Sequence, residues 1–243
     1  MIWVGSLTIL ALLGSAPARA DEKADALLAE VRGVTLATQS LSGDFSFVQQ
    51  RAGSEMKFDG KFELKRPNLA HIEMGEPLAR TIVSDGKTVW SLLRPLHQYT
   101  KKAADTEGIS LPLFSPITFF FYPGMLGTPG PAPKGAKPAA VTTKLAGKET
   151  IEGTEYQVIE VTQEKPVAST TLLYIGADKR LARMTVVRKG TNPVTLTYLL
   201  KNVKADSTLD SRDFTFTPPK DAQLMTPAGP EETGTPPKGK KGK

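Results

Sequence analysis

The sequence of 243 residues contains no cysteine. Disulfide bonds, thiolate metal sites, cysteine nucleophiles and lipid attachment to a cysteine are therefore excluded. Histidine occurs only at His71 and His97, which is too few for a histidine-rich metal site. The sequence also lacks a phosphate-binding glycine loop and the glycine-flanked serine elbow of hydrolases. Because no acid–base pair or activated nucleophile emerges, we predict a protein that is not an enzyme and holds no metal or cofactor.

A large excess of basic over acidic residues is missing from the body of the chain, although the formal net charge is +6. A nucleic-acid surface needs basic residues clustered on one face of the fold, so we predict no nucleic-acid partner. Residues 226–243 are rich in Pro, Gly, Thr, Glu and Lys, which is typical of a disordered tail. This tail could contact an anionic membrane, but keeping the protein soluble is the simpler explanation. Four lysines lie in its last six residues: Lys238, Lys240, Lys241 and Lys243.

A long hydrophobic run is also missing. Residues 1–20 contain only a short apolar stretch, which includes Ile9–Leu13, and no Lys or Arg precedes it. A membrane anchor is the competing interpretation, but a span needs roughly 18 uninterrupted apolar residues. Ala18-Arg19-Ala20 fits the small-x-small rule for signal cleavage. We therefore predict a signal peptide that is cleaved after Ala20 and export of the chain. An exported chain without cysteine suits a bacterial envelope and must be stable without disulfides.

The remaining chain shows one helical pattern and many strand patterns. Apolar residues at helical spacing predict an amphipathic helix over residues 23–38. Residues 51–60 are predicted to form a hairpin turn, and Asp85-Gly86 a second one. Alternating apolar and polar residues predict about ten short strands. These cover residues 45–50, 61–66, 69–74, 80–84, 88–93, 98–101, 156–163, 170–175, 182–188 and 194–203, with a last short strand at 214–216.

Between the two groups of strands lies an apolar insert, Ile109–Tyr122, that could hold one or two short helices. A loop rich in Pro, Gly and Ala follows at residues 123–138. Because tight turns join most strands, antiparallel pairing is expected. We predict one domain over residues 21–225 of mainly β (α+β) class, built on a single curved antiparallel sheet. The helix and the insert are the segments available to cover its apolar face.

Arg66 is the residue that fits this pattern least. Phe62, Leu64 and Arg66 share one parity in the strand before Pro67, so a guanidinium points to the apolar face. Its stem could pack on Leu64 while its charged end reaches water. Alternatively, its donors could bridge several carbonyl oxygens of a covering segment, because an unpaired charge on an apolar face is costly.

The same parity argument selects residues that could line an apolar cavity. Ordinary core packing is the alternative for each of them. As a group they support a cavity more strongly than any one of them does. A single sheet with so much apolar area must either cover that area or bind a ligand with it. The candidates on strands are Phe47, Phe62, Leu64, Ile72, Met74, Ile82, Trp90 and Leu92, and the candidates for a covering lid are Phe119, Phe120 and Phe121.

Several ordered motifs resemble the LolA family of periplasmic outer-membrane lipoprotein carriers. Lys65–Asn68 (KRPN) and Ser84–Trp90 (SDGKTVW) are two of them. Asp213–Pro219 (DFTFTPP) resembles the family's closing strand, and Phe47–Gln49 its first strand. The resemblance spans roughly residues 24–224 in the same order.

The resemblance implies a half-open β-barrel with a helical lid, and an apolar cavity that takes the acyl chains of lipoproteins. It implies that a monomer receives its cargo from an inner-membrane ABC transporter and passes it to an acceptor at the outer membrane. The arginine of the KRP motif ties the lid shut in this family, which assigns that role to Arg66. Two alternatives remain open: a carrier of another lipid, such as a glycolipid or hopanoid, and an envelope-stress sensor with a related fold.

Overall fold

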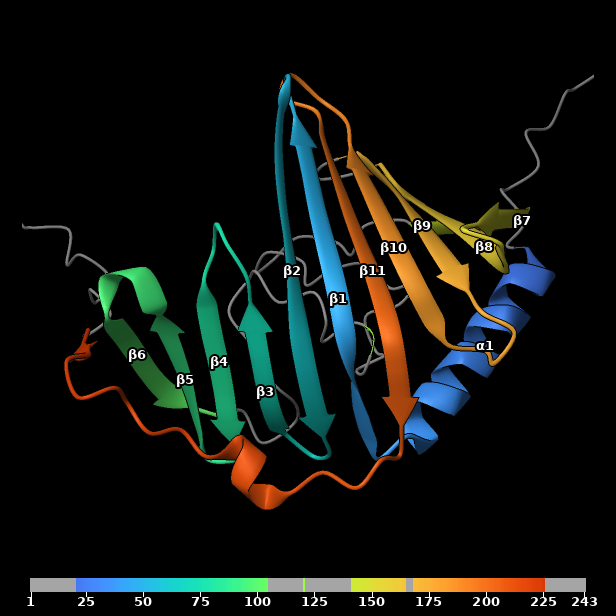
Figure 1. The fold of residues 1–243 in the computed structure, drawn as a ribbon. Coiled ribbons are helices and arrows are strands. Elements are labelled where there is room, and N and C mark those ends of the chain that lie inside the picture. Colours follow the sequence, from blue (N-terminus) through green and yellow to red (C-terminus); the bar gives the residue numbers. More distant parts are fainter. Residues whose placement is uncertain (1–20, 105–119, 121–140, 165–167, 226–243) are drawn as a thin grey trace, which may run out of the picture.

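The fold is one large open sheet with a single long helix beside it (Figure 1). A computed structural model of the chain describes residues 21–104, 120, 141–164 and 168–225. The predicted signal peptide, the lid residues Phe119 and Phe121, the loop at 123–138 and the tail lie outside the described residues. None of the helices in the described ranges is long and apolar enough to cross a membrane.

Twelve strands form the sheet, in the order β12-β6-β5-β4-β3-β2-β1-β11-β10-β9-β8-β7. Neighbouring strands are antiparallel, except that β12 runs parallel to β6. The prediction of a mainly β fold with a single curved sheet is confirmed, whereas closure into a half-open barrel under a helical lid stays a prediction. The strands are β1 (Ser40–Arg51), β2 (Ser54–Lys65), β3 (Leu69–Met74), β4 (Arg80–Asp85), β5 (Thr88–Leu93), β6 (Gln98–Ala103), β7 (Val141–Ile151), β8 (Thr154–Gln163), β9 (Ser169–Ile175), β10 (Leu181–Arg188), β11 (Val194–Ala205) and β12 (Gln223–Leu224).

The first hairpin is longer and tighter than predicted. Its turn consists of Ala52 and Gly53, both with positive φ, and β2 already begins at Ser54. The prediction of a turn over residues 51–60 was therefore wrong. Gly60, which suggested a turn, is a packing glycine within β2, because a Cβ atom there would collide with the ring of Phe45. The glycine allows an aromatic ring of β1 to lie across the neighbouring strand.

The strands β7 and β12 were not predicted from the sequence, and the predicted strand at 214–216 is absent. Most residues of β7 are exposed, so its sequence shows little apolar alternation. β12 has two residues. Phe214 does not lie in a strand but ends a 3-10 helix, η3 (Ser211–Phe214), which is capped by Asp210. The prediction of a strand at 214–216 was wrong. Two phenylalanines at alternating positions look like a strand in the sequence, but here they anchor a segment that packs across the sheet without pairing to it. A second 3-10 helix, η1 (Arg94–Leu96), joins β5 to β6.

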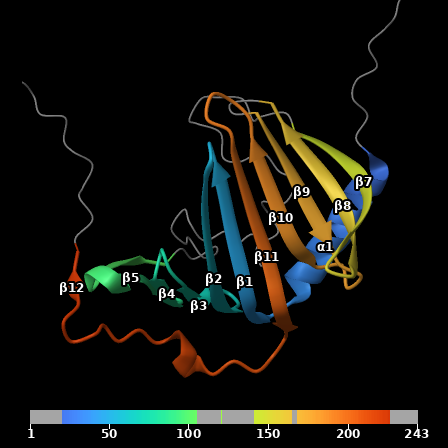
Figure 2. The same ribbon diagram turned by 45° about the horizontal axis from the view of Figure 1, so that its top comes forward.

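The helix α1 (Glu22–Ala37) begins at Asp21, whose side chain accepts hydrogen bonds from the backbone N–H groups of Lys23 and Ala24. Such an N-cap satisfies donors that the first turn leaves without helical partners. The sheet curves around the side on which α1 lies, so α1 is on its concave face near β7–β10 (Figures 1 and 2). Four apolar residues of α1 are buried there: Ala24, Leu27, Leu28 and Val31.

Candidate functional site

The concave face of the sheet carries the main apolar cluster of the described residues. Paired residues of antiparallel strands point to the same face, so the register assigns residues to it. Phe47 pairs with Phe58 of β2 and with Tyr198 of β11, and Tyr198 pairs with Met184 of β10. The ring of Phe47 lies 4.9 Å from that of Phe58 and 4.8 Å from that of Tyr198. This aromatic row continues the apolar surface against which α1 packs.

Six of the eight strand residues predicted to line a cavity come together on this face. All six are at most 6% exposed and belong to the same cluster as the buried residues of α1. Burial to this extent is compatible with core packing as well as with a cavity that closes when empty, so their role in lipid binding stays a prediction. They are Phe47, Phe62, Leu64, Ile72, Met74 and Ile82.

Trp90 and Leu92 lie on the opposite, convex face of the sheet. The prediction that they line a cavity on the concave face was therefore wrong. The register pairs Trp90 with Val83, whereas Ile82 pairs with Ser91 and faces the other way. The ring of Trp90 stacks on Phe216 of the C-terminal segment, with centroids 5.7 Å apart. Because that segment covers the convex face, β5 is apolar on both sides, and parity alone cannot tell the faces apart.

Of the three predicted lid residues, only Phe120 is described. Its side chain is 5% exposed and belongs to the concave cluster. With Thr38 at the end of α1 and Leu200 of β11, it borders a small void of about 10 Å³. Phe120 therefore packs at the end of the helix, as a covering residue would.

Arg66 contacts the helix and does not simply reach into water. Its Nε donates a hydrogen bond of 2.8 Å to the carbonyl oxygen of Thr38, and Nη2 donates one of 2.9 Å to that of Thr35. These carbonyls lie at the C-terminal end of α1, where the helix dipole favours a positive charge. The last turn of α1 contains no basic residue of its own. Arg66 therefore supplies this charge from the sheet.

A second arginine contacts the same helix end. Arg180, between β9 and β10, donates a hydrogen bond of 2.7 Å from Nη1 to the hydroxyl of Thr38. That hydroxyl donates in turn to the carbonyl oxygen of Val34. Two guanidinium groups from different parts of the sheet thus hold the last turn of α1 in place.

The first turn of α1 is tied to the edge strand β7. Oδ2 of Asp21 accepts a hydrogen bond of 2.8 Å from the backbone N–H of Leu145. This hydrogen bond is the main reason that the pKa of Asp21 is lowered from its ordinary value. The hydroxyl of Thr143 donates to Oδ1 of Asp25, at 2.8 Å. Polar contacts therefore hold α1 at both ends, while its middle packs through apolar side chains.

The two motifs around Arg66 and Trp90 are joined by hydrogen bonds. Nδ2 of Asn68 donates to the carbonyl oxygen of Gly86, at 2.9 Å, and the buried hydroxyl of Ser84 donates to the carbonyl oxygen of Asn68, at 2.7 Å. Oδ1 of Asp85 accepts from the N–H groups of Lys87 and Thr88 and forms the turn. This network fixes the end of the strand that positions Arg66.

Part of the concave face is a floor of apolar residues that keep some exposure to solvent. We call these residues the open floor. They adjoin the cluster covered by α1, and their alternation is that of ordinary strand residues, so the sequence gives no signal that sets them apart. The open floor consists of Met56, Val161, Val186, Leu196 and Tyr198.

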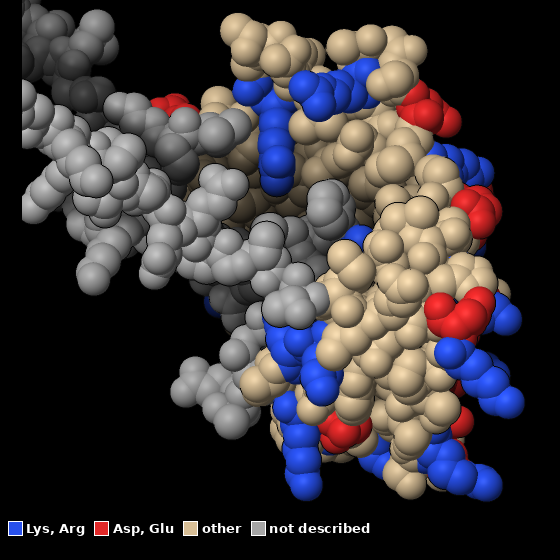
Figure 3. All heavy atoms as spheres, turned by 90° about the vertical axis from the view of Figure 1, so that its left-hand side faces the viewer, with Lys and Arg blue, Asp and Glu red and all other residues tan. Residues whose placement is uncertain are grey.

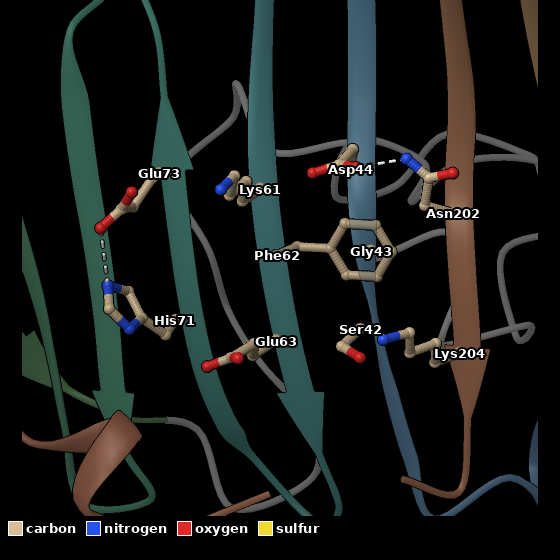
Figure 4. A pocket seen from close by; sticks show the side chains of 10 residues that line it. All are labelled: Ser42, Gly43, Asp44, Lys61, Phe62, Glu63, His71, Glu73, Asn202 and Lys204. Carbon is tan, nitrogen blue, oxygen red and sulfur yellow. Dashed lines mark hydrogen bonds and ion pairs between the residues drawn. The ribbon is translucent and has the colours of Figure 1, made fainter.

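The convex face differs in chemistry. Across β11, β1, β2 and β3 it has a shallow depression with a volume of about 350 Å³. Figure 4 shows the side chains around it, among them the charged groups of Asp44, Lys61, Glu63, Glu73 and Lys204. Such a lining suits water better than acyl chains. Figure 3, which looks from the end of the sheet that carries β6 and β12, shows a hollow whose visible walls are mostly uncharged, with Lys and Arg side chains around it.

Among the described residues there is no group of three or more His, Asp or Glu side chains that could hold a metal ion. The ion pairs of the two histidines, His71 with Glu73 and His97 with Asp221, each involve one carboxylate. The chemistry of the site is therefore that of an apolar surface with a helix held over part of it by arginines.

Comparison with known proteins matches residues 37–114 to the family model of the outer membrane lipoprotein carrier protein LolA. An outer-membrane lipoprotein carrier protein of Chromobacterium violaceum is 33% identical over 89 residues, which cover 37% of this chain and 41% of that protein. One of Glaesserella parasuis serovar 5 is 47% identical over 51 residues, which cover 20% of this chain and 24% of that protein. The matches thus span less than half the length of these relatives.

The fold also occurs in a solved structure. An uncharacterised conserved protein from Thermus thermophilus superposes with a TM-score of 0.52 over 84% of this chain and 99% of that chain. The two sequences are 14% identical, so the likeness concerns the fold alone. The family match covers β1–β6, and the structural likeness extends over most of the sheet.

Proposed function

We propose that the chain, whose residues 37–114 match the LolA family model, is a member of that family and a periplasmic carrier of lipoproteins. The concave face binds the acyl chains of the cargo. The protein receives them from an inner-membrane ABC transporter and delivers them to an acceptor at the outer membrane, as a monomer exported after cleavage behind Ala20. The family's description as a carrier agrees with a protein that is not an enzyme.

The observation that supports this proposal most is the open floor beside the helix α1. Burying an acyl chain contributes about 0.8 kcal/mol per CH₂ group. A cargo with two or three acyl chains therefore offers more free energy than a carrier can use, because the carrier must also release it. A helix that is held over the apolar face by arginines offsets part of this free energy, since cargo must displace it.

Arg66 is the residue to which we assign this control. Its guanidinium donates hydrogen bonds to the carbonyl oxygens of Thr35 and Thr38. Entering acyl chains would separate α1 from the sheet and break these hydrogen bonds, and re-forming them would favour release. The state with the helix closed and the state with cargo bound then have nearly equal free energies, which transfer between two membranes requires.

The test is to identify what the protein carries. The full-length chain should be expressed in its native host, purified from the periplasm without detergent, and analysed by mass spectrometry for bound lipids and proteins. Acylated lipoproteins are the expected finding. Enrichment of a glycolipid or hopanoid without lipoproteins would replace this proposal by a carrier of another lipid. Recovery of a membrane-bound regulator, without lipoproteins and without another lipid, would favour the envelope-stress sensor.

A transfer assay tests the direction of the process. Inner-membrane vesicles that hold a radiolabelled lipoprotein and the transporter should release it into solution only when ATP and this protein are both present. Addition of outer-membrane vesicles should then remove the label from the carrier. Release that does not depend on the protein would contradict the proposal.

A further inference from the structure

Tyr198 places the single hydroxyl group of the open floor within an otherwise hydrocarbon surface. The residue lies in β11, between Phe47 of β1 and Met184 of β10, both of which are buried in the concave cluster. Its ring packs 4.8 Å from that of Phe47. A phenylalanine would fill the same position without bringing a polar atom to the apolar face. The hydroxyl therefore needs an explanation other than packing.

The Tyr198 hydroxyl makes no hydrogen bond to another group in the part of the chain that the structure describes. Burial of the ring raises the pKa of Tyr198 to about 12. The phenol therefore remains a protonated donor at any pH that the periplasm experiences. A donor with partial exposure and no protein partner can offer its hydrogen to a bound molecule.

The concave face becomes more polar along β10 and β11, beyond Tyr198. The row through Tyr198 is apolar on both sides, with Phe47, Met184 and Leu173. The next row contains Leu196 and Val186, flanked by Gln49 and Thr171. The third row contains Arg51 and Arg188 on either side of Val194. Successive rows are roughly 6.6 Å apart along the strands.

This gradient matches the order of groups in an acylated molecule. Its charged or polar end fits the row of arginines, its hydrocarbon chains fit the aromatic row, and the carbonyl groups that join them lie in between. We propose that Tyr198 positions the cargo by donating a hydrogen bond from its hydroxyl to the ester or amide carbonyl at the head of an acyl chain. This inference rests on the proposed carrier function and adds a requirement to it: the carrier distinguishes acyl chains from alkyl chains.

The experiment compares two synthetic lipopeptides that differ only in this carbonyl. One carries two palmitoyl chains in ester linkage on an S-glyceryl cysteine, and the other carries two hexadecyl chains in ether linkage. Dissociation constants for the full chain are measured by displacement of a fluorescent acyl probe. We expect the wild-type protein to bind the ester form about 3- to 10-fold more tightly, which is the range for one neutral hydrogen bond.

Two variants separate the hydroxyl from the ring. Tyr198→Phe should bind both lipopeptides as the wild type binds the ether form, so that the preference disappears. Tyr174→Phe is the matched control, because Tyr174 lies in β9 on the convex face and its ring packs under Arg183. This control should keep the full preference. Circular dichroism of both variants should be unchanged, since each loses a single oxygen atom.

The outcomes are distinct. Equal binding of the two lipopeptides by the wild type, or an ester preference that survives in Tyr198→Phe, would overturn the role of Tyr198 and leave the carrier function standing. Failure of every protein to bind either lipopeptide would overturn both. A second arm repeats the comparison with diester and diether phosphatidylcholine vesicles. If the preference that depends on Tyr198 occurs with these vesicles and not with the lipopeptides, the carbonyl contact stands but belongs to phospholipid.

Discussion

Among the described residues, the helix α1 and the C-terminal segment cover opposite faces of the sheet at opposite ends, and they are held in different ways. The helix α1 covers the concave face near β7–β10 and is fixed at both ends by hydrogen bonds, through Arg66 and Asp21. The C-terminal segment covers the convex face near β3–β5 and is fixed by Phe214, which is 1% exposed, and by the stacking of Phe216 on Trp90.

This difference suggests which cover moves. Hydrogen bonds to the end of a helix can be exchanged for water one at a time, because water replaces the lost protein partner. An aromatic side chain in a closed core can leave only by exposing its whole apolar surface. The exchangeable cover lies on the apolar face that we propose for cargo, and the fixed cover lies on the charged face. The predictions below test this contrast.

The largest effect is expected at the fixed cover. Phe214→Ala should lower the free energy of unfolding by about 3–5 kcal/mol, because it leaves a cavity under the C-terminal segment. Urea denaturation followed by tryptophan fluorescence measures this loss. Phe216→Ala, at a partly exposed position, should cost clearly less. A loss below about 1 kcal/mol for Phe214→Ala would show that the C-terminal segment is not a structural cover.

The exchangeable cover should show a functional effect that exceeds its effect on stability. Arg66→Leu should fold and still bind lipoprotein, but it should fail to hand the cargo on. Hydrogen bonds from a charged group contribute about 1.5–3 kcal/mol, so transfer to outer-membrane vesicles should fall at least about tenfold. Arg183→Leu, an arginine of β10 that stacks on Tyr174 on the convex face, is the control. Normal transfer by Arg66→Leu would remove Arg66 from the mechanism.

Neighbouring valines of β10 test which face binds acyl chains. Val186 faces the open floor, Val187 faces the convex side, and both are partly exposed. Val186→Asp should weaken binding of a diacyl lipopeptide about tenfold, because a carboxylate on the floor would lose water when cargo binds. Val187→Asp should leave the dissociation constant unchanged. Equal effects of the two substitutions would place the binding surface elsewhere.

The smallest effect concerns the N-terminal tie of α1. The pKa of Asp21 is lowered in the folded protein, mainly by the N–H of Leu145, so the ionised carboxylate stabilises the fold. This contribution is present above the ordinary value of 3.8 and is lost as the pH falls through the lowered pKa. Melting temperatures of the wild type and Asp21→Asn should therefore differ at about pH 6 and converge below about pH 3. A constant difference over this range would contradict the assignment.

The sequence predicted the fold well where one face of a strand is apolar and the other is polar. β3 is such a strand, and Ile72 and Met74 lie where their parity places them. The prediction failed at β5, where Val89 and Leu92 are both buried, on opposite faces. It also failed at β7, whose mostly exposed residues give no alternation.

Arg66 shows, at the candidate site, the same difference between what the sequence predicts and what it leaves open. Its strand parity placed the guanidinium on the apolar face, and two outcomes were then open: exposure to water or contact with a covering segment. No property of residues 62–67 could choose between them, because the accepting carbonyls belong to Thr35 and Thr38, about thirty residues earlier in the chain. The choice depends on where α1 packs.

The sequence by itself therefore determined the strands whose two faces differ in polarity and the unusual position of one arginine, because side-chain alternation is a local property of an extended chain. Only the tertiary structure decided which face became the concave one, what covers each face and which carbonyls satisfy Arg66. These features depend on contacts between residues that are distant in the sequence, and such contacts are set by how the whole sheet curves around the helix.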